Sequence, residues 1–265
     1  MVIVLAGTIP RNLLFAANLQ VFQTIPWAVP ATALYLWFFW RYLHGDWPVD
    51  DTAATRRASL RAHALPSVVW FWALLAGGLG IVALVLALRI ANRFVALPDQ
   101  TLPPELAQVP PITLISLLLA AAPIAGIIEE SAFRGYMQGP IERRYGLVVA
   151  ILITGTMFAV AHLDFTWQLW PYYVAVAAIY GTVTHLTNSI LPAIVLHTAG
   201  NLYSNFDLWL HGRAEWQAGA GGADALLLPA AILAIVVIAM LWAYARLARV
   251  AVSDSRISRP AHPSP

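Results

Sequence analysis

Seven long apolar stretches recur along this chain of 265 residues, and they constrain its fold more than any other feature. A helix needs roughly 20 mostly apolar residues to cross a bilayer. We expect spans at residues 14–43, 67–92, 111–138, 147–163, 169–187, 189–206 and 225–248. The sequence therefore predicts an all-α, polytopic membrane bundle of about seven transmembrane helices.

The composition places this bundle in lipid. Hydrophobic residues make up 60% of the chain and charged residues only 11%, whereas soluble domains carry about a quarter charged residues. The formal net charge of +2 gives no indication of a nucleic-acid partner, and none is expected. Cysteine is absent, which excludes disulfides, cysteine nucleophiles and thiolate metal sites. We expect a multi-pass protein of the cell membrane whose permanent partner is the lipid bilayer.

The placement of arginine predicts an orientation. With seven spans, ten arginines fall on one side: Arg41, Arg56, Arg57, Arg61, Arg143, Arg144, Arg246, Arg249, Arg256 and Arg259. Arg11, Arg89, Arg93 and Arg213 fall on the other side. The positive-inside rule then predicts an external N-terminus and a cytoplasmic C-terminus. Residues 1–9 are too short to span, and a removable signal peptide is not expected.

We expect one integral membrane domain over residues 1–252, with a functional core at about 110–206. The Ser-, Arg- and Pro-containing segment 253–265 is expected to be a disordered cytoplasmic tail. The segments 44–66, 139–146 and 207–224 are expected to connect helices. Four aromatic residues resemble an interfacial belt, and three polar residues are assigned to an external loop. These are Trp167, Trp170, Tyr172 and Tyr173, and then Asn205, Asp207 and His211.

Three polar clusters interrupt the apolar stretches. They are Glu129 and Glu130 with Arg134, Phe158 with His162, and His197 with Asn201. Ionisable groups at membrane depth are expensive and usually have a partner or a function. Their presence on three neighbouring segments therefore indicates a catalytic or transport site.

The adjacent carboxylates Glu129 and Glu130 are expected to have different roles, because neighbouring residues on a helix point about 100° apart. Glu130 and Arg134 have the four-residue spacing of an ion pair on one helical face. This pairing leaves Glu129 to face a cavity, where a carboxylate can act as a general base. The structural alternative is an interfacial pair that anchors the end of a membrane helix.

The two histidines also allow two interpretations. His162 follows Phe158 by one helical turn, and in isolation it could simply bind a carbonyl at the interface. His197 and Asn201 share a helical face, so they could form half of a metal site, a pair of oxyanion donors or a helix–helix contact. At a rise of 1.5 Å per residue, Glu129 and His197 lie roughly 11–14 Å deep, but His162 lies at about 22 Å. A shared site therefore requires a tilted or re-entrant path for His162.

The ordered pattern Glu-Glu-x-x-x-Arg, Phe-x-x-x-His and His-x-x-x-Asn resembles the CPBP family of intramembrane proteases. This family includes type II CAAX prenyl endopeptidases and bacteriocin-processing or immunity proteins, also called the Abi family. The local segments agree: Glu-Glu-Ser-Ala-Phe-Arg-Gly, Phe-Ala-Val-Ala-His-Leu and Leu-His-Thr-Ala-Gly-Asn. The resemblance covers about residues 110–206.

The resemblance implies an endopeptidase in which Glu129 and His162 activate a water. It further implies that His197 and Asn201 stabilise the oxyanion, and that Glu130 and Arg134, together with Phe158, orient the site. Two mechanisms remain open: a zinc enzyme with Glu129, His162 and His197 as ligands, and a metal-independent glutamate mechanism. The implied substrate is a peptide or a prenylated protein.

Two alternatives from other functional classes are retained. Intramembrane carboxylates and histidines also relay protons in transporters, although the sequence shows no inverted repeat. The chain could also be a catalytically silent scaffold or immunity protein that keeps the fold and binds partners.

Overall fold

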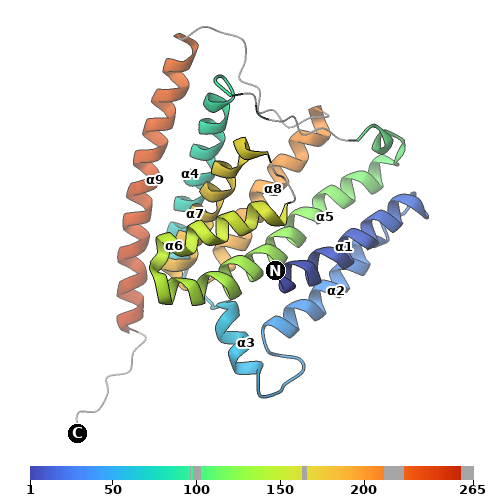
Figure 1. Ribbon diagram of the computed structural model, residues 1–265, viewed down its shortest axis with the longest axis horizontal. Coiled ribbons are helices and arrows are strands. Elements are labelled where there is room, and N and C mark those ends of the chain that lie inside the picture. Colours follow the sequence, from blue (N-terminus) through green and yellow to red (C-terminus); the bar gives the residue numbers. More distant parts are fainter. Residues whose placement is uncertain (96, 98–102, 163–165, 212–223, 258–265) are drawn as a thin grey trace.

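The computed structural model describes residues 1–95, 97, 103–162, 166–211 and 224–257, and every regular element among them is helical (Figure 1). The all-α prediction is therefore confirmed. The elements are α1 (Val2–Gln20), α2 (Ala28–Leu43), α3 (Ala53–Leu60), α4 (Ser67–Ala91), η1 (Pro104–Gln108), α5 (Pro111–Glu130), η2 (Ser131–Met137), α6 (Gln138–Ala161), η3 (Trp167–Leu169), α7 (Trp170–Thr187), α8 (Leu191–His211) and α9 (Asp224–Ile257).

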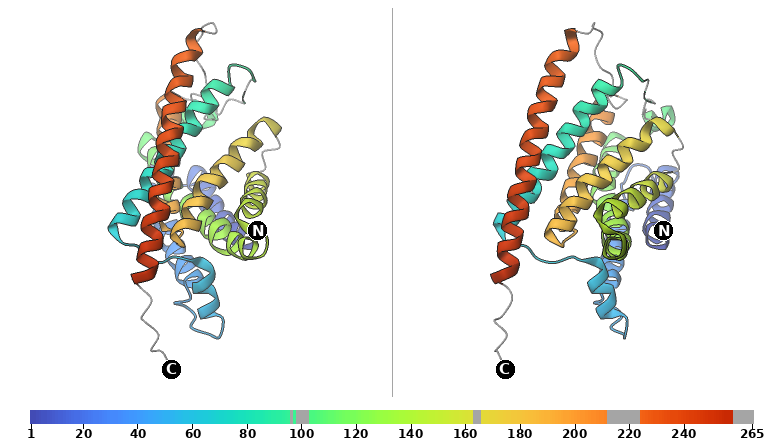
Figure 2. Two further views of the ribbon diagram at one scale, coloured as in Figure 1. Left: turned by 90° about the vertical axis from the view of Figure 1, so that its left-hand side faces the viewer. Right: turned by 60° about the vertical axis from the view of Figure 1, so that its left-hand side comes forward.

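The helices pack as neighbouring pairs. α9 lies along α4 at one side of the molecule, and the α1–α2 hairpin lies beside α5 at the other (Figures 1 and 2). Between them, α5 packs on α8 and α6 packs on α7. Small residues allow close approach: a Cβ at Gly155 of α6 would lie 2.9 Å from the Val174 Cα of α7. The central helices are therefore held tightly enough to position side chains between them.

The expected single span at 14–43 is wrong. The chain instead forms α1 and α2, which pack against each other and are joined by a turn at residues 21–27. Asn18 organises this turn: its Nδ2 donates to the Ile25 carbonyl at 2.9 Å, and its Oδ1 accepts from the Ala28 amide at 3.0 Å. Buried polar groups need such partners, so Asn18 stabilises the turn, while Phe22, with φ 54°, and Pro26, which has no amide hydrogen, interrupt the helix itself. Because the prediction of an external N-terminus assumed one span here, it no longer follows from the arginine count.

Within the described part of the chain, four helical segments are long and apolar enough to cross a membrane: Val2–Gln20, Ser67–Ala91, Pro111–Ala161 and Leu226–Val252. The long third segment includes the expected connector 139–146, which is helical except at Gly146 (φ 83°, ψ 168°). A count of seven spans stays a prediction.

The expected tail contains helix at its beginning, because α9 continues past residue 252 to Ile257. The rest of that segment, 258–265, lies outside the described residues, as do Arg213 and Arg259. Of the expected connector 207–224, the first residues belong to α8, which ends at His211.

A π-helix, η2, joins α5 to α6 without interrupting the helical path. Such wide turns are rare and often occur at functional sites. The segment is almost entirely buried, including the Arg134 side chain, which is fully enclosed. The α5–η2–α6 segment therefore carries two of the three polar clusters into the centre of the bundle.

Candidate active site

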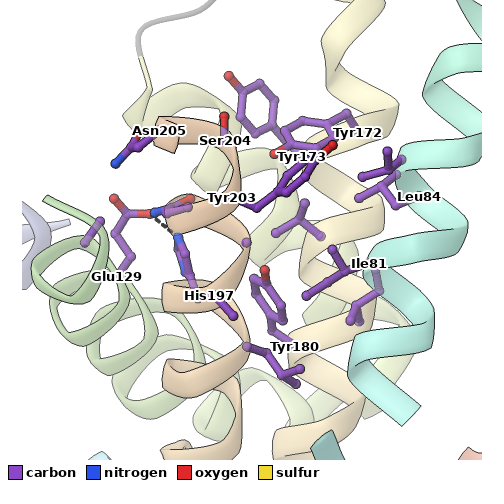
Figure 3. Close-up of a pocket in the computed structure, with 18 of the residues that line it drawn as sticks. Ile81, Leu84, Glu129, Tyr172, Tyr173, Tyr180, His197, Tyr203, Ser204 and Asn205 are labelled. Atoms are coloured by element: carbon purple, nitrogen blue, oxygen red, sulfur yellow. Dashed lines mark ion pairs between the residues drawn. The ribbon is translucent and has the colours of Figure 1, made fainter. Parts of the chain in front are cut away.

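One cavity of 560 Å³ receives side chains from all three polar clusters. Glu129 of α5, His162 at the end of α6, and His197 and Asn201 of α8 all line it. In Figure 3, Glu129 and His197 come from separate helices and lie next to each other on one side of the cavity, joined by a dashed line. The structure thus brings together the four residues that the sequence singled out for chemistry.

Behind this cavity, Glu130, Arg134 and His197 form a buried network. The Glu130 Oε1 atom lies 3.2 Å from Arg134 Nη1 and 2.7 Å from His197 Nδ1. The side chains of Glu130 and Arg134 are completely buried. The predicted Glu130–Arg134 ion pair is confirmed, and it extends to a histidine that the spacing alone did not connect to it.

Aromatic rings surround the Arg134 guanidinium. Its Cζ atom lies 5.1 Å from the Phe158 ring centroid, 5.4 Å from that of Tyr180 and 5.9 Å from that of Phe133. A cation over aromatic faces is stabilised where water is excluded. Phe158, singled out by the sequence as a partner of His162, therefore also encloses the arginine.

His197 lies between the two adjacent glutamates. Its Nδ1 bonds to Glu130, and its Nε2 lies 3.7 Å from Glu129 Oε2 (Figure 3). Since an ionised carboxylate only accepts hydrogen bonds, we assign a hydrogen to Nδ1. The Tyr180 ring stacks on the imidazole, with centroids 5.3 Å apart and an interplanar angle of 21°. The ring orientation is thus held from two sides, and Nε2 is left toward Glu129.

His162 reaches the same cavity despite the greater depth calculated for a straight helix. Its Nδ1 lies 2.8 Å from the Phe158 carbonyl oxygen, which is the local bond expected from the four-residue spacing. Its ring centroid lies 4.6 Å from that of Phe158 and 4.9 Å from that of Tyr173. The depth calculation counted the rise along the membrane normal from residue 147, which follows the kink at Gly146, and so took no account of how the helix beyond the kink is tilted.

The sequence analysis missed several residues of the cavity wall. Tyr172 and Tyr173, assigned to an interfacial belt, line the cavity, and so do Arg11 of α1 and Asn205. Asn205 belongs to α8 and donates to the Leu118 carbonyl at 2.8 Å, so its assignment to an external loop is wrong. The sequence did indicate that Asn205 lies on this wall, because it follows Asn201 by four residues, just as Asn201 follows His197.

The opposite wall of the cavity is apolar and comes mainly from α4. Gly78, Ile81, Leu84, Val85 and Leu88 line it at helical spacing, and Arg89 follows them near the end of the helix. Ile81 and Leu84 face the tyrosines of α7 in Figure 3. The cavity therefore combines a polar wall that holds ionisable groups with a mainly apolar wall that can contact hydrophobic groups of a ligand.

A zinc site was one expectation for Glu129, His162 and His197. Among the described residues, no three His, Asp or Glu side chains are grouped closely enough to hold one metal ion. As placed, this trio does not form a ligand set, and the pair that does approach, Glu129 and His197, has the spacing of an ion pair. The zinc hypothesis stays a prediction.

Comparison with known proteins agrees with the motifs. Residues 111–203 match the family model described as type II CAAX prenyl endopeptidase Rce1-like. The UPF0177 protein YxdF of Lactococcus lactis subsp. lactis (strain IL1403) is 34% identical over 84 residues, which cover 30% of this chain. The match spans 45% of that relative's length. No solved structure matches the chain significantly.

The resemblance to the CPBP family, and to its CAAX endopeptidase branch in particular, is therefore confirmed over residues 111–203. Together with the four long apolar helices among the described residues, this match supports a multi-pass membrane protein. The matched segment contains η2 and all three polar clusters, whereas α1, α4 and α9 lie outside it.

Proposed function

We propose that the chain is an intramembrane endopeptidase that hydrolyses a peptide bond of a membrane-associated or prenylated protein. The observation that carries this proposal is the shared cavity of Glu129, His162, His197 and Asn201, backed by the buried Glu130–Arg134 pair. Peptide hydrolysis requires a water, a base and oxyanion donors, and an apolar region supplies none of these by itself. The polar wall of this cavity contains side chains for each role.

In the proposed reaction, Glu129 takes a proton from water while the oxygen of that water bonds to the carbonyl carbon of the substrate. His162 orients the water from the end of α6. As the tetrahedral intermediate collapses, the C–N bond breaks and the proton held by Glu129 passes to the departing amine.

The negative charge on the carbonyl oxygen is stabilised by His197 and Asn201. Protonated His197 can donate from Nδ1 to Glu130 and from Nε2 into the cavity. The Asn201 amide can donate from one helical turn further along α8. Glu130 and Arg134 orient His197 through the 2.7 Å bond at Nδ1 and act as positioning residues.

The first test compares the wild type with Glu129→Gln. Both proteins would be purified in nanodiscs and assayed with fluorogenic peptides that carry or lack a farnesyl group. Because this change removes the base but keeps the shape, we expect the rate to fall by about 10²–10⁴-fold. Glu105→Gln, an exposed carboxylate outside the cavity, is the matched control and should cleave normally.

Each arm would be repeated with a strong chelator and with metal analysis of the purified protein. Activity that survives chelation supports the glutamate mechanism, and activity lost with it and restored by zinc supports a metal enzyme. Normal cleavage by Glu129→Gln would overturn the assignment of the base. Ion flux that the same variant abolishes, in the absence of any cleavage, would support the transporter alternative.

A further inference from the structure

A second cleft lies outside the catalytic cavity, between α3 and the junction of η2 with α6. Its volume is 440 Å³, and none of its lining residues belongs to the catalytic cavity. Small and hydroxyl-bearing side chains form most of its wall, among them Thr55, Ser59, Gly135 and Gly139. The remaining polar groups of the wall are two guanidinium groups, those of Arg61 and Arg143.

The two arginines converge at Gly139. A Cβ atom placed on that glycine would lie 3.5 Å from Arg143 Nη1 and 3.9 Å from Arg61 Cζ. The absence of a side chain at this position therefore leaves open the space between the two positive groups. Two guanidinium groups that face one small space are the usual arrangement for a phosphate or another planar or tetrahedral anion.

Arg61 lines the cleft although it is almost completely buried, with only 7% of its surface exposed. Its Nη2 donates to the Arg134 carbonyl, and its Nη1 lies 3.8 Å from Glu142 Oε2. Its buried Nε has no hydrogen-bond partner among the described residues. Buried donors are normally satisfied, so this group has hydrogen-bonding capacity that a ligand can use.

The local charge balance is positive. Glu142 is shared, since it also accepts from Gln138 at 3.0 Å and pairs with His185 at 2.6 Å. Arg143 is exposed and makes no ion pair within the described part of the chain. Burial lowers the pKa of Arg61, Glu142 opposes this shift and Arg143 adds to it. An anion between the two arginines would remove the repulsion between them.

We propose that the cleft between α3 and α6 binds a phosphate-type anion. In the orientation that the arginine pattern predicts, the cleft lies on the arginine-rich side, where the positive-inside rule places the anionic leaflet of a membrane. A phospholipid headgroup and a free phosphate share the chemistry that two guanidinium groups and two hydroxyls recognise.

The segment next to this cleft touches the elements that carry the catalytic cavity. Besides the bond to the Arg134 carbonyl in η2, the Arg61 carbonyl accepts from the Ile190 amide at 3.0 Å. The Ser189 hydroxyl donates to the His63 carbonyl at 2.8 Å. Residues 61–63 thus connect η2 with the turn that precedes α8, and a bound anion would stiffen this connection.

The test measures binding, so it does not depend on the proposed protease activity. Full-length protein in neutral detergent would be titrated with short-chain phosphatidylglycerol, with short-chain phosphatidylcholine and with inorganic phosphate, and bound ligand would be counted by native mass spectrometry. Removal of one charged donor should weaken phosphatidylglycerol binding about tenfold in Arg143→Gln. Gly139→Leu, which fills the cleft without altering its charge, should weaken it similarly.

Arg144→Gln is the matched control, because Arg144 is the adjacent arginine but does not line the cleft. The proposal holds if binding survives in Arg144→Gln and is lost in Arg143→Gln and Gly139→Leu. Competition by inorganic phosphate would favour a free anion, whereas binding of phosphatidylglycerol alone would favour a lipid headgroup. Equal loss of binding in Arg143→Gln and Arg144→Gln would overturn the proposal, because it would mean that diffuse surface charge attracts the anion. Equal binding of phosphatidylcholine would also overturn it, because it would mean nonspecific contact with lipid.

Discussion

The two walls of the catalytic cavity differ in almost every respect. The wall formed by α5, α6 and α8 is backed by buried charges, a π-helix and close helix–helix contacts, and most of it lies within the segment that matches a protease family. The wall from α4 contains a glycine and four aliphatic residues, with one arginine, Arg89, near the end of the helix, and it lies outside that segment. Ionisable groups are costly in an apolar medium, and the fully buried Glu130 and Arg134 accordingly lie where each is the partner of the other.

This difference separates two tasks. The polar wall must hold a few atoms within fractions of an ångström, because oxyanion donors and bases act only at hydrogen-bond distance. The α4 wall needs only a suitable shape and hydrophobicity, so it can vary with the substrate. Substitutions should therefore have large and specific effects on the polar wall and small, substrate-dependent effects on the α4 wall.

The largest effect on stability is expected for Arg134→Met. This change leaves the fully buried Glu130 without its cationic partner, and breaking a buried pair typically costs about 3–5 kcal/mol. The free energy of unfolding would be measured in mixed micelles. Arg144→Met, at an exposed arginine, is the control. Equal stability of the two variants would show that the buried pair contributes nothing.

Asn201→Ala should have the next largest effect, on rate rather than stability. Loss of one oxyanion donor lowers the rate by about 10²–10³-fold in soluble proteases. Asn205→Ala, one turn further along the same cavity wall, is the comparison and should reduce the rate less. A cleavage assay of both proteins, with unfolding curves as a check on folding, decides between them. A similar loss in both would assign Asn201 a structural role.

The smallest expected effect compares two glycines, one near each wall. A Cβ at Gly155 would lie 2.9 Å from the backbone of Val174, whereas a Cβ at Gly78 would meet no atom within 4 Å. Gly155→Ala should therefore destabilise the protein by about 1–3 kcal/mol through overpacking. Gly78→Ala should be neutral or stabilising by up to about 1 kcal/mol, because alanine favours helix. Thermal unfolding would measure the change in stability of each variant, and equal changes in the two would contradict the prediction.

Local patterns in the sequence predicted much of the site. The four-residue spacing of Glu130 and Arg134 predicted their ion pair, and the spacing of His197 and Asn201 predicted their common face. These predictions succeed because residues four apart on a helix are neighbours whatever the rest of the fold does.

Features that depend on tertiary structure could not be predicted in the same way. The bond between His197 and Glu130 joins residues of different helices, and the contact of His162 with Tyr173 depends on how α6 packs against α7. Tyr172 and Tyr173 were assigned to a membrane interface because aromatic residues at a helix start have that distribution on average. The break at residues 21–27, by contrast, had a local signal in Pro26, which a criterion based on the length of the apolar stretch does not register.

The π-helix has a consequence for how this protein can change over evolution. Its wide turn accommodates one residue more than an α-helical turn, so the extra residue is absorbed locally and the orientation of α6 relative to α5 is kept. Deleting one residue from this turn would restore α-helical bonding with the following helix in the same orientation, whereas a deletion within the regular part of α5 would rotate all that follows by about 100°. A scan of single-residue deletions along α5–α6 should therefore be tolerated best at residues 135–137, where the spacing of Glu130 and Arg134 is unchanged, and a uniform profile would contradict this. We expect a change of one residue in length to be tolerated in this segment more readily than elsewhere along α5 and α6.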